Sequence, residues 1–210
     1  MPKTDPFENH HDEYEEWFET YKPVYISELE AIRNVLPVEG IGLEIGVGSG
    51  LFAAPLGIKF GCDPSLKMLK KAIERGISGI EGAAENLPYG DSTFDYALMV
   101  TVICFVDDPT KAVMEAHRIL RSNGKFVIAF VDKESPIGKQ YLKFKNKSVF
   151  YKDATFFSTS EIYNLLEQNG FKIVRTVETV FGSMEDINEQ QKPREGHGEG
   201  SFVVIVGSRI

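Results

Sequence analysis

The pattern in this sequence that most clearly indicates a ligand site is a glutamate followed by three glycines. The first glycine comes two residues after the glutamate, and the three glycines occupy alternate positions. The stretch runs Leu43-Glu44-Ile45-Gly46-Val47-Gly48-Ser49-Gly50. The apolar residues before the glycines are typical of the end of a buried strand, and the glycines make a turn that no side chain obstructs. An apolar segment follows at 51–56, so exposed N–H groups at the start of a helix can face a ligand. The pattern predicts a site for a nucleoside-containing cofactor.

Residue 51 separates this stretch from the dinucleotide fingerprint G-x-G-x-x-G. The third glycine of that fingerprint would fall at residue 51, where the chain has Leu51. The pattern present is E-x-G-x-G-x-G, in which Glu44 lies at the carboxyl end of a strand and can face a positively charged or hydroxylated ligand. A tight turn from strand to helix that binds nothing is the alternative interpretation.

A second carboxylate, Asp63, follows the next predicted strand. Ligands of open α/β sheets bind outside the carboxyl ends of the strands, and a carboxylate there can accept hydrogen bonds from both hydroxyls of a ribose. The alternative is that Asp63 caps the helix that follows, although Ser65 also offers a cap. The sequence therefore predicts a ribose contact at Asp63 and leaves the capping role open.

The elements that must position these residues alternate between strands and helices. Apolar runs predict strands at 41–45, 58–62, 78–81, 94–100, 125–131, 171–181 and 202–207. Helices are predicted at 11–20 and 24–36, and after Ser65, Pro109 and Ser158. Residues 82–93 barely allow a crossover, so we expect a loop or a single helical turn there. Residues 182–200 are expected to form a long, mobile connection.

The last two predicted strands have no helix between them, so we expect them to be antiparallel neighbours. The predicted fold class is α/β: a doubly wound, mostly parallel seven-stranded sheet with an antiparallel last strand, helices on both faces and an N-terminal helical cap. We expect one domain over 1–210. It would comprise N-terminal helices (1–37), a cofactor-binding core (38–131), a lid insertion (132–157) and a C-terminal helix with the antiparallel strands (158–210).

Composition and charge bound the class of protein. The chain has 210 residues, of which 42% are hydrophobic and 26% charged, and its net charge of −8 argues against broad binding to nucleic acid or to an anionic membrane surface. No run is long enough to cross a bilayer. The N-terminal residues are polar and acidic, unlike a secretory signal, so we expect a cytoplasmic protein. Cys62 and Cys104 lie in apolar stretches and are expected to be small buried residues rather than a disulfide.

Five sequence blocks in a suitable order resemble the class I S-adenosylmethionine-dependent methyltransferases. The blocks are L-E-I-G-V-G-S-G, G-C-D-P-S, G-A-A-E-N-L-P-Y, D-S-T-F-D-Y and E-A-H-R-I-L-R-S-N-G-K, within residues 41–131. The blocks resemble those of the small-molecule group that includes the ubiquinone and menaquinone biosynthesis methyltransferases, and Tyr14-x-x-Trp17-Phe18 resembles the segment before the domain in that group. The resemblance implies a Rossmann-like methyltransferase that uses S-adenosylmethionine.

The resemblance also implies roles for individual residues. It assigns Glu44, Gly46, Gly48 and Gly50 to the methionine end of the cofactor and Asp63 to its ribose. The adenine edge would be formed by Ala84, Glu85, Asn86 and Leu87. Thr101 and Val102 suit a wall beside the sulfonium, and Tyr14 and Phe18 would pack over the cofactor from an N-terminal helix; as alternatives, the first pair is a plain strand end and the second the buried face of that helix.

Two departures from the family pattern bear on these roles. Many relatives carry an acid one residue after the glycine of the third block, where this chain has Ala83. Adenine would then be held by backbone groups and apolar packing. The segment after the fourth strand lacks the histidine that often appears there. No catalytic residue is predicted, since an activated sulfonium mainly requires that nucleophile, methyl carbon and sulfur be held in line without water.

The segment 132–157 combines lysines with aromatic residues. The lysines are Lys133, Lys139, Lys143, Lys145, Lys147 and Lys152, and the aromatics are Tyr141, Phe144, Phe150 and Tyr151. One hypothesis is that this lid closes over the site and helps receive an anionic or aromatic substrate. The other is a solvated lysine face on a helix.

Other patterns lead to weaker hypotheses. Tyr141-x-x-x-Lys145 matches the tyrosine–lysine spacing of short-chain dehydrogenases, but the glycine loop does not fit that family. His10-His11-Asp12 contains metal-binding residue types, yet adjacent histidines point apart, so no metal is predicted. The predicted function is methyl transfer to an unidentified small-molecule acceptor, in a protein whose oligomeric state the sequence leaves open. A non-catalytic cofactor-binding sensor and an NAD-linked oxidoreductase are the alternatives.

Overall fold

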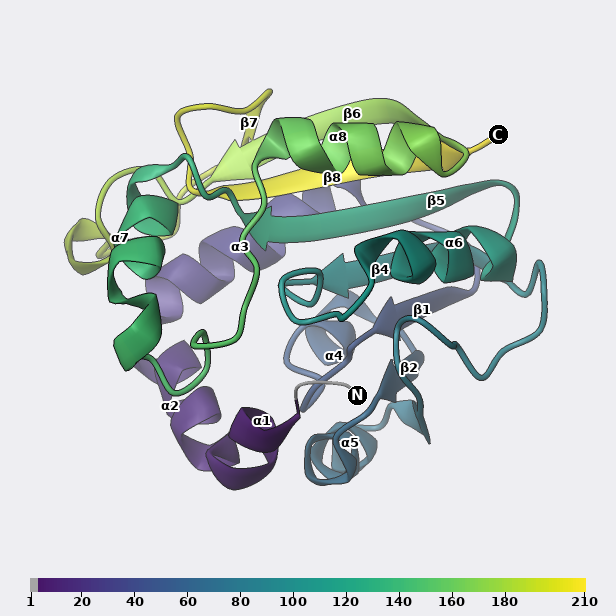
Figure 1. Cartoon of the computed structure of the whole chain (residues 1–210), viewed down its shortest axis with the longest axis horizontal. Coiled ribbons are helices and arrows are strands. Elements are labelled where there is room, and N and C mark those ends of the chain that lie inside the picture. The colour runs from purple at the N-terminus through teal and green to yellow at the C-terminus, as the bar shows by residue number, and fades with distance from the viewer. Residues whose placement is uncertain (1–3) are drawn as a thin grey trace.

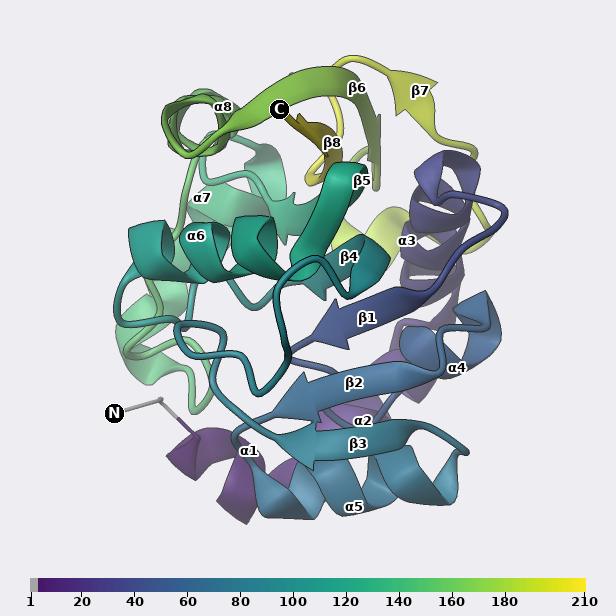
Figure 2. The same ribbon diagram turned by 90° about the vertical axis from the view of Figure 1, so that its right-hand side faces the viewer.

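The computed structural model describes residues 4–210 and contains one eight-stranded sheet flanked by helices (Figures 1 and 2). The strands are β1 (Gly42–Ile45), β2 (Phe60–Asp63), β3 (Ser78–Glu81), β4 (Phe94–Val100), β5 (Leu120–Val131), β6 (Phe171–Thr179), β7 (Arg194–Glu195) and β8 (Phe202–Arg209). The helices are α1 (Asp5–Asn9), α2 (His11–Thr20), α3 (Lys22–Val35), α4 (Ala53–Leu56), α5 (Leu66–Glu74), α6 (Pro109–Ile119), α7 (Pro136–Phe144) and α8 (Thr159–Gln168), with 3₁₀ turns η1 (Lys145–Lys147) and η2 (Met184–Asp186).

The sheet has the order β3-β2-β1-β4-β5-β8-β6-β7. Strands β1 to β5 pair in parallel, so their carboxyl ends meet at one edge. Strand β8 is antiparallel both to β5 and to β6. The mostly parallel sheet and the antiparallel pairing of the last two predicted strands are therefore confirmed.

Alternation along the central strands creates a core on each face of the sheet. In β4, Leu98 and Val100 pack in one core, while Ala97 and Met99 pack in the other. The first core contains buried residues of α3, α4 and α5, and the second those of α6 and α8 (Figure 1). Cys62 and Cys104 are buried thiols and form no disulfide.

Two segments depart from the predictions. Helix α1 was not predicted; its apolar content is low and it has no side-chain N-cap bond. The segment 182–200 is not wholly irregular, because it contains η2 and the two-residue strand β7, which adds an eighth strand to the predicted seven. Asp132 fixes the start of the lid segment by accepting bonds from the Thr159 N–H and hydroxyl, at 2.9 and 2.6 Å, and α7 follows.

The division into an N-terminal segment, core, lid and C-terminal part stays a prediction, and residues 1–3 of the segment 1–37 lie outside the described range. Within residues 4–210, no helix combines the length and the apolar composition that crossing a membrane requires.

Candidate active site

The glycine loop leaves β1 at the edge where the parallel strands end. The N–H groups of Gly46 and Val47 donate to the Cys62 carbonyl at 2.8 and 2.9 Å, which ties the loop to β2. Gly46, Gly48 and Gly50 have φ of 69°, 52° and 83°, the left-handed region that favours glycine. A Cβ at Gly46 would lie only 2.3 Å from Val102 Cγ2. The loop therefore packs its backbone directly against the end of β4.

Gly46→Ala should lower the free energy of unfolding by about 1–2 kcal/mol more than Gly57→Ala does. Both substitutions strain the backbone, but only at Gly46 does the added methyl group also clash with Val102. Gly57 is the matched control, since its φ is 76° but nothing lies within 4 Å of an added Cβ. Chemical denaturation of both variants measures the difference. If both variants lose the same stability, Val102 moves aside easily, and close packing is not the reason that residue 46 must be glycine.

Glu44 lies beneath the loop, 2% exposed. Its Oε2 has no hydrogen-bond partner within the described residues, while the Ala53 backbone bonds the carboxylate. Burial raises the pKa of this carboxyl well above its usual range, and the neighbouring Asp63 charge adds to the rise. A buried carboxylate oxygen without a partner fits a site whose bound group supplies a hydrogen-bond donor or a positive charge.

Asp63 ends β2 and holds two loops together. Its Oδ2 accepts the Gly48 N–H and its Oδ1 the Ser65 N–H, each at 2.8 Å. Ser65, not Asp63, is the N-cap of α5, because its hydroxyl accepts the Met68 N–H. Burial raises the pKa of Asp63 to about 6, and the two backbone N–H groups oppose that rise. Each carboxylate oxygen keeps a lone pair for a ligand hydroxyl.

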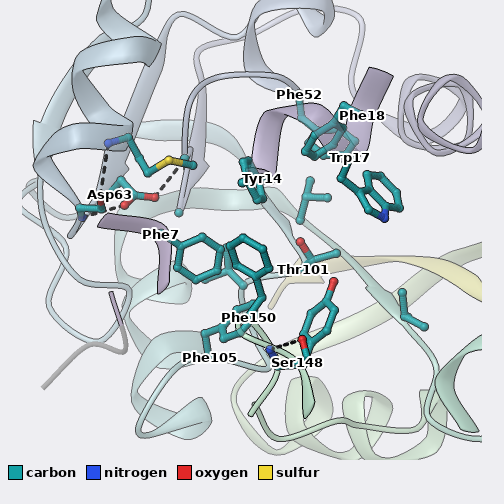
Figure 3. Close-up of a pocket in the computed structure, with 18 of the residues that line it drawn as sticks. Phe7, Tyr14, Trp17, Phe18, Phe52, Asp63, Thr101, Phe105, Ser148 and Phe150 are labelled. Atoms are coloured by element: carbon teal, nitrogen blue, oxygen red, sulfur yellow. Dashed lines mark hydrogen bonds between the residues drawn. The ribbon is translucent and has the colours of Figure 1, made fainter. Parts of the chain in front are cut away.

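A pocket of about 490 Å³ opens between the glycine loop, the N-terminal helices and the lid segment (Figure 3). Its volume lies within the roughly 300–1,000 Å³ typical of small-molecule sites. Nine of the predicted site residues line it: Tyr14, Phe18, Gly46, Gly48, Asp63, Ala84, Glu85, Thr101 and Val102. Glu44, Gly50, Asn86 and Leu87 are not among the lining residues. The structure thus brings most of the predicted set around one cavity.

The predicted adenine segment contributes unevenly to the pocket. The Glu85 carboxylate accepts the N–H groups of Asp107 and Asp108 at 2.7 and 3.3 Å, so it ties the loop before α6 to the rim of the pocket. Leu87 is buried in the core, and its N–H donates to Glu115 at 2.8 Å. Asn86 is exposed. Of this segment, Ala84 and Glu85 alone among the predicted residues face the cavity.

Aromatic rings from distant parts of the chain close over the cavity (Figure 3). Phe7 of α1 lies 5.8 Å from Tyr14 of α2, 5.1 Å from Phe105 and 5.7 Å from Phe150, measured between ring centroids. Sequence reasoning missed Phe7 and Phe105. The spacing of Phe7, Tyr14 and Phe18, seven and then four residues, is a helical stripe that could have identified Phe7.

Polar contacts hold these N-terminal helices on α5. Glu15 pairs with Arg75 at 2.9 Å and with Lys71 at 3.1 Å, and Arg75 also donates to the Ser49 carbonyl of the glycine loop at 2.7 Å. The Ser65 hydroxyl donates to Glu8 at 2.6 Å. These partly buried contacts add to the packing of Phe18 in the core, so both polar and apolar contacts hold α2 in place.

The lysines of the lid segment do not line the pocket. Lys133 pairs with Glu161 at 2.6 Å, and Lys139 and Lys143 are exposed. Tyr141, Phe144, Phe150 and Tyr151 face the cavity instead. The hypothesis that the lysines receive an anionic substrate is therefore not supported, whereas the aromatic part of that hypothesis agrees with the geometry.

The N-terminal histidines lie beside carboxylates. His10 Nδ1 is 2.8 Å from Glu13 Oε1, and His11 Nε2 is 3.4 Å from Asp12 Oδ1.

Sequence reasoning also missed Glu28, on the buried face of α3. Its side chain lines the cavity and is 7% exposed, and burial raises the pKa of its carboxyl to about 8. A glutamate on a helix that otherwise buries apolar residues such as Leu29 and Ile32 is the signal that could have marked it.

Comparisons with known proteins show the family to which the chain belongs. A family model described as a methyltransferase domain matches residues 43–128. The crystal structure of a SAM-dependent methyltransferase from Thermotoga maritima, named as a possible histamine N-methyltransferase, is 49% identical, with a TM-score of 0.97 over 99% of this chain and 100% of that chain. An uncharacterized protein of Methanocaldococcus jannaschii is 42% identical over 97% of this chain and 98% of that protein.

A relative with a printed activity matches over a shorter range. The ubiquinone/menaquinone biosynthesis C-methyltransferase of Rickettsia akari is 30% identical over 139 residues, which are 57% of this chain and 56% of that protein. The glycine loop, Asp63 and the partnerless Glu44 oxygen fit a ligand that combines hydroxyl groups with a positively charged end, as S-adenosylmethionine does. The chain therefore belongs to the class I S-adenosylmethionine-dependent methyltransferases, and S-adenosylmethionine is its cofactor.

Proposed function

We propose that the protein methylates a small-molecule acceptor bound in the same pocket as the cofactor. The observation that carries this proposal is that one cavity is lined both by the glycine loop with Asp63 and by the aromatic residues of α2 and the lid segment. Helices α1 and α2 cover this cavity on one side and residues 136–151 on another, which suits an enclosed small molecule better than a polymer. The acceptor then lies beside the cofactor and away from water.

The predicted residue roles are part of this proposal. Asp63 would accept the ribose hydroxyls, and the unpartnered Glu44 oxygen would face the charged methionine end of the cofactor. Thr101 and Val102 would form the wall at the carboxyl end of β4. Bound S-adenosylmethionine supplies a methyl group that is already activated by its sulfonium, so the chain's task is to orient the acceptor and exclude water.

Tyr14 and Phe18 would cover the cofactor from α2. Tyr14 is suited to this, since its hydroxyl oxygen lies 3.8 Å from the position of a Cβ at Gly48. Burial raises the pKa of Tyr14 far above its usual range, so its phenol stays neutral and can donate a hydrogen bond.

The alternatives make different demands on ligand binding and turnover. An NAD-linked oxidoreductase would need a dinucleotide loop, which Leu51 disfavours. A sensor would bind S-adenosylmethionine without turnover. The relatives' names point to two acceptor chemistries, a nitrogen in the possible histamine N-methyltransferase and a carbon in the quinone-pathway C-methyltransferase.

A cytoplasmic location also stays a prediction from the sequence.

Calorimetric titration followed by a turnover assay tests the proposal. We expect S-adenosylmethionine and S-adenosylhomocysteine to bind with one-to-one stoichiometry and NAD to give no saturable heat. Incubation with a methyl-labelled donor and a panel of small acceptors should then label at least one of them. Binding without labelling of any acceptor would favour the sensor, and failure of both adenosyl compounds to bind would contradict the proposal.

A further inference from the structure

The carboxylate of Glu28 is buried at the wall of the pocket. Within the range 4–210, the structure gives this side chain no hydrogen bond and no ion pair, and desolvation is the cause of its raised pKa. Helix α3 places it between Ser27 and Leu29, both buried. A buried carboxylate without a partner lowers the stability of the folded state, so its retention in a cavity points to a ligand that compensates it.

The pocket that Glu28 lines is also lined by the phenols of Tyr14, Tyr141 and Tyr151. The charge of Glu28 acts on Tyr14 of α2, Tyr25 of α3, Tyr141 of α7 and Tyr151 of the lid segment. Burial raises the pKa of each phenol, and the Glu28 charge adds to the rise, so none of them carries a charge near neutral pH. Aromatic faces next to a carboxylate are the surroundings that bind organic cations.

The pocket as a whole carries acidic side chains. Within the described residues, its lining includes Glu13, Glu28, Asp63, Glu85 and Glu185 and no lysine, arginine or histidine. Asp63 and Glu85 are already bonded to backbone N–H groups, and Glu185 is exposed. A cavity with walls of one charge sign concentrates ligands of the opposite sign. Glu28 is the buried member of this set that has no hydrogen-bond partner within residues 4–210, so its charge is left for a ligand to neutralise.

We propose that the acceptor is a small organic amine and that Glu28 receives its ammonium group among the rings of Tyr14 and Tyr141. An ammonium nitrogen has no lone pair, so it would give a proton to the Glu28 carboxylate before accepting the methyl group that S-adenosylmethionine supplies, with S-adenosylhomocysteine as the leaving group. The inference rests on the proposed function, since it names the class of acceptor for the same pocket. It favours a cationic nitrogen compound over a neutral quinol or an anionic substrate. The lysines of α7 lie outside the cavity, which agrees with this choice.

Binding of charged and uncharged ligands of one shape tests the proposal. The full chain is saturated with S-adenosylhomocysteine and titrated calorimetrically with histamine, 2-phenylethylamine, 2-phenylethanol and phenylacetate. We expect one or both amines to bind, and the alcohol and the carboxylate to bind at least about tenfold more weakly. Glu28→Gln should weaken amine binding roughly 10- to 100-fold, the value of a hydrogen bond to a charged group.

Glu30→Gln is the matched control, because Glu30 lies on the same helix, outside the pocket, and pairs with Arg33. It should leave amine binding unchanged. The proposal is overturned if neither amine binds, if the alcohol binds as tightly as the amine, or if Glu28→Gln keeps the amine affinity. It is also overturned if Glu28→Gln weakens S-adenosylhomocysteine binding, since Glu28 would then serve the cofactor. Failure of the unaltered chain to bind S-adenosylhomocysteine would instead contradict the proposed function.

Discussion

Asp63→Ala should weaken S-adenosylmethionine binding about 100-fold. Two hydrogen bonds from ribose hydroxyls to a buried carboxylate would be lost, and bonds to a charged group are worth about 1.5–3 kcal/mol each, with partial compensation by water. The substitution also frees the Gly48 and Ser65 N–H groups, which the carboxylate holds at 2.8 Å. The glycine loop would then lose one of its hydrogen bonds to β2, from Gly48, in addition to the ribose contact, while Gly46 and Val47 keep theirs to Cys62.

Asp63→Asn weakens both contributions only in part, because its NH2 group replaces one of the two oxygens that accept backbone N–H groups. Asparagine keeps one acceptor oxygen and the shape of the side chain, so we expect an intermediate loss of about tenfold. Asp95→Ala is the matched control: this carboxylate accepts the Ile41 N–H at 2.7 Å and pairs with Arg121, but it lies at the amino-terminal end of β4, across the sheet from the pocket. It should reduce stability and leave cofactor affinity unchanged. If Asp63→Ala folds and binds S-adenosylmethionine as tightly as the unaltered chain, Asp63 only holds the loops in place and does not bind the ribose.

The core of the fold could be predicted because its signals are local. Strands β1, β4 and β5 contain apolar runs, and helices such as α5 and α8 begin at Ser65 and Ser158, whose caps the structure contains. The loop glycines were evident for the same reason, since left-handed backbone is nearly confined to glycine. Asp63 followed from the rule that ligands bind at the carboxyl ends of parallel strands.

What the sequence did not reveal depends on long-range packing. Strand β7 exists because Arg194 and Glu195 pair with β6, and neither residue has a strand pattern of its own. Phe7 reaches the pocket only because α1 folds back on α5, through Glu8 and Ser65. Glu28 could be read as one more polar residue of a surface helix. Its burial arises because α3 packs on the sheet and α2 and the lid segment close the other side.

Glu28 should make the unliganded protein less stable as the pH rises. Its carboxyl has an ordinary pKa of 4.5 when unfolded and a pKa of about 8 when folded. Between these values the folded chain holds a proton that the unfolded chain has lost, so the free energy of unfolding falls with increasing pH. At about 1.4 kcal/mol per pKa unit, the penalty reaches at most about 5 kcal/mol above pH 8 and vanishes below pH 4.5.

Glu28→Gln removes this titration. Relative to the unaltered chain, the variant should have nearly the same melting temperature at pH 5 and a clearly higher one at pH 8. Glu44 and Asp63 also have raised pKa values, but they are present in both proteins and cancel in the comparison. The phenols of Tyr14, Tyr25, Tyr141 and Tyr151 stay neutral over this range. Glu30→Gln should show no such divergence, because Glu30 is half-exposed.

A bound amine should reverse the penalty. With S-adenosylhomocysteine and histamine both in excess at pH 8, an ammonium group beside Glu28 stabilises its charged form, so the unaltered chain should recover most of its deficit relative to Glu28→Gln. The variant should gain little from the same ligand. If the two unliganded proteins differ in melting temperature by the same amount at pH 5 and at pH 8, the Glu28 carboxylate is hydrated or paired in solution. A side chain compensated in that way would have no need of a cationic acceptor, so this stability measurement tests the acceptor class independently of any turnover assay.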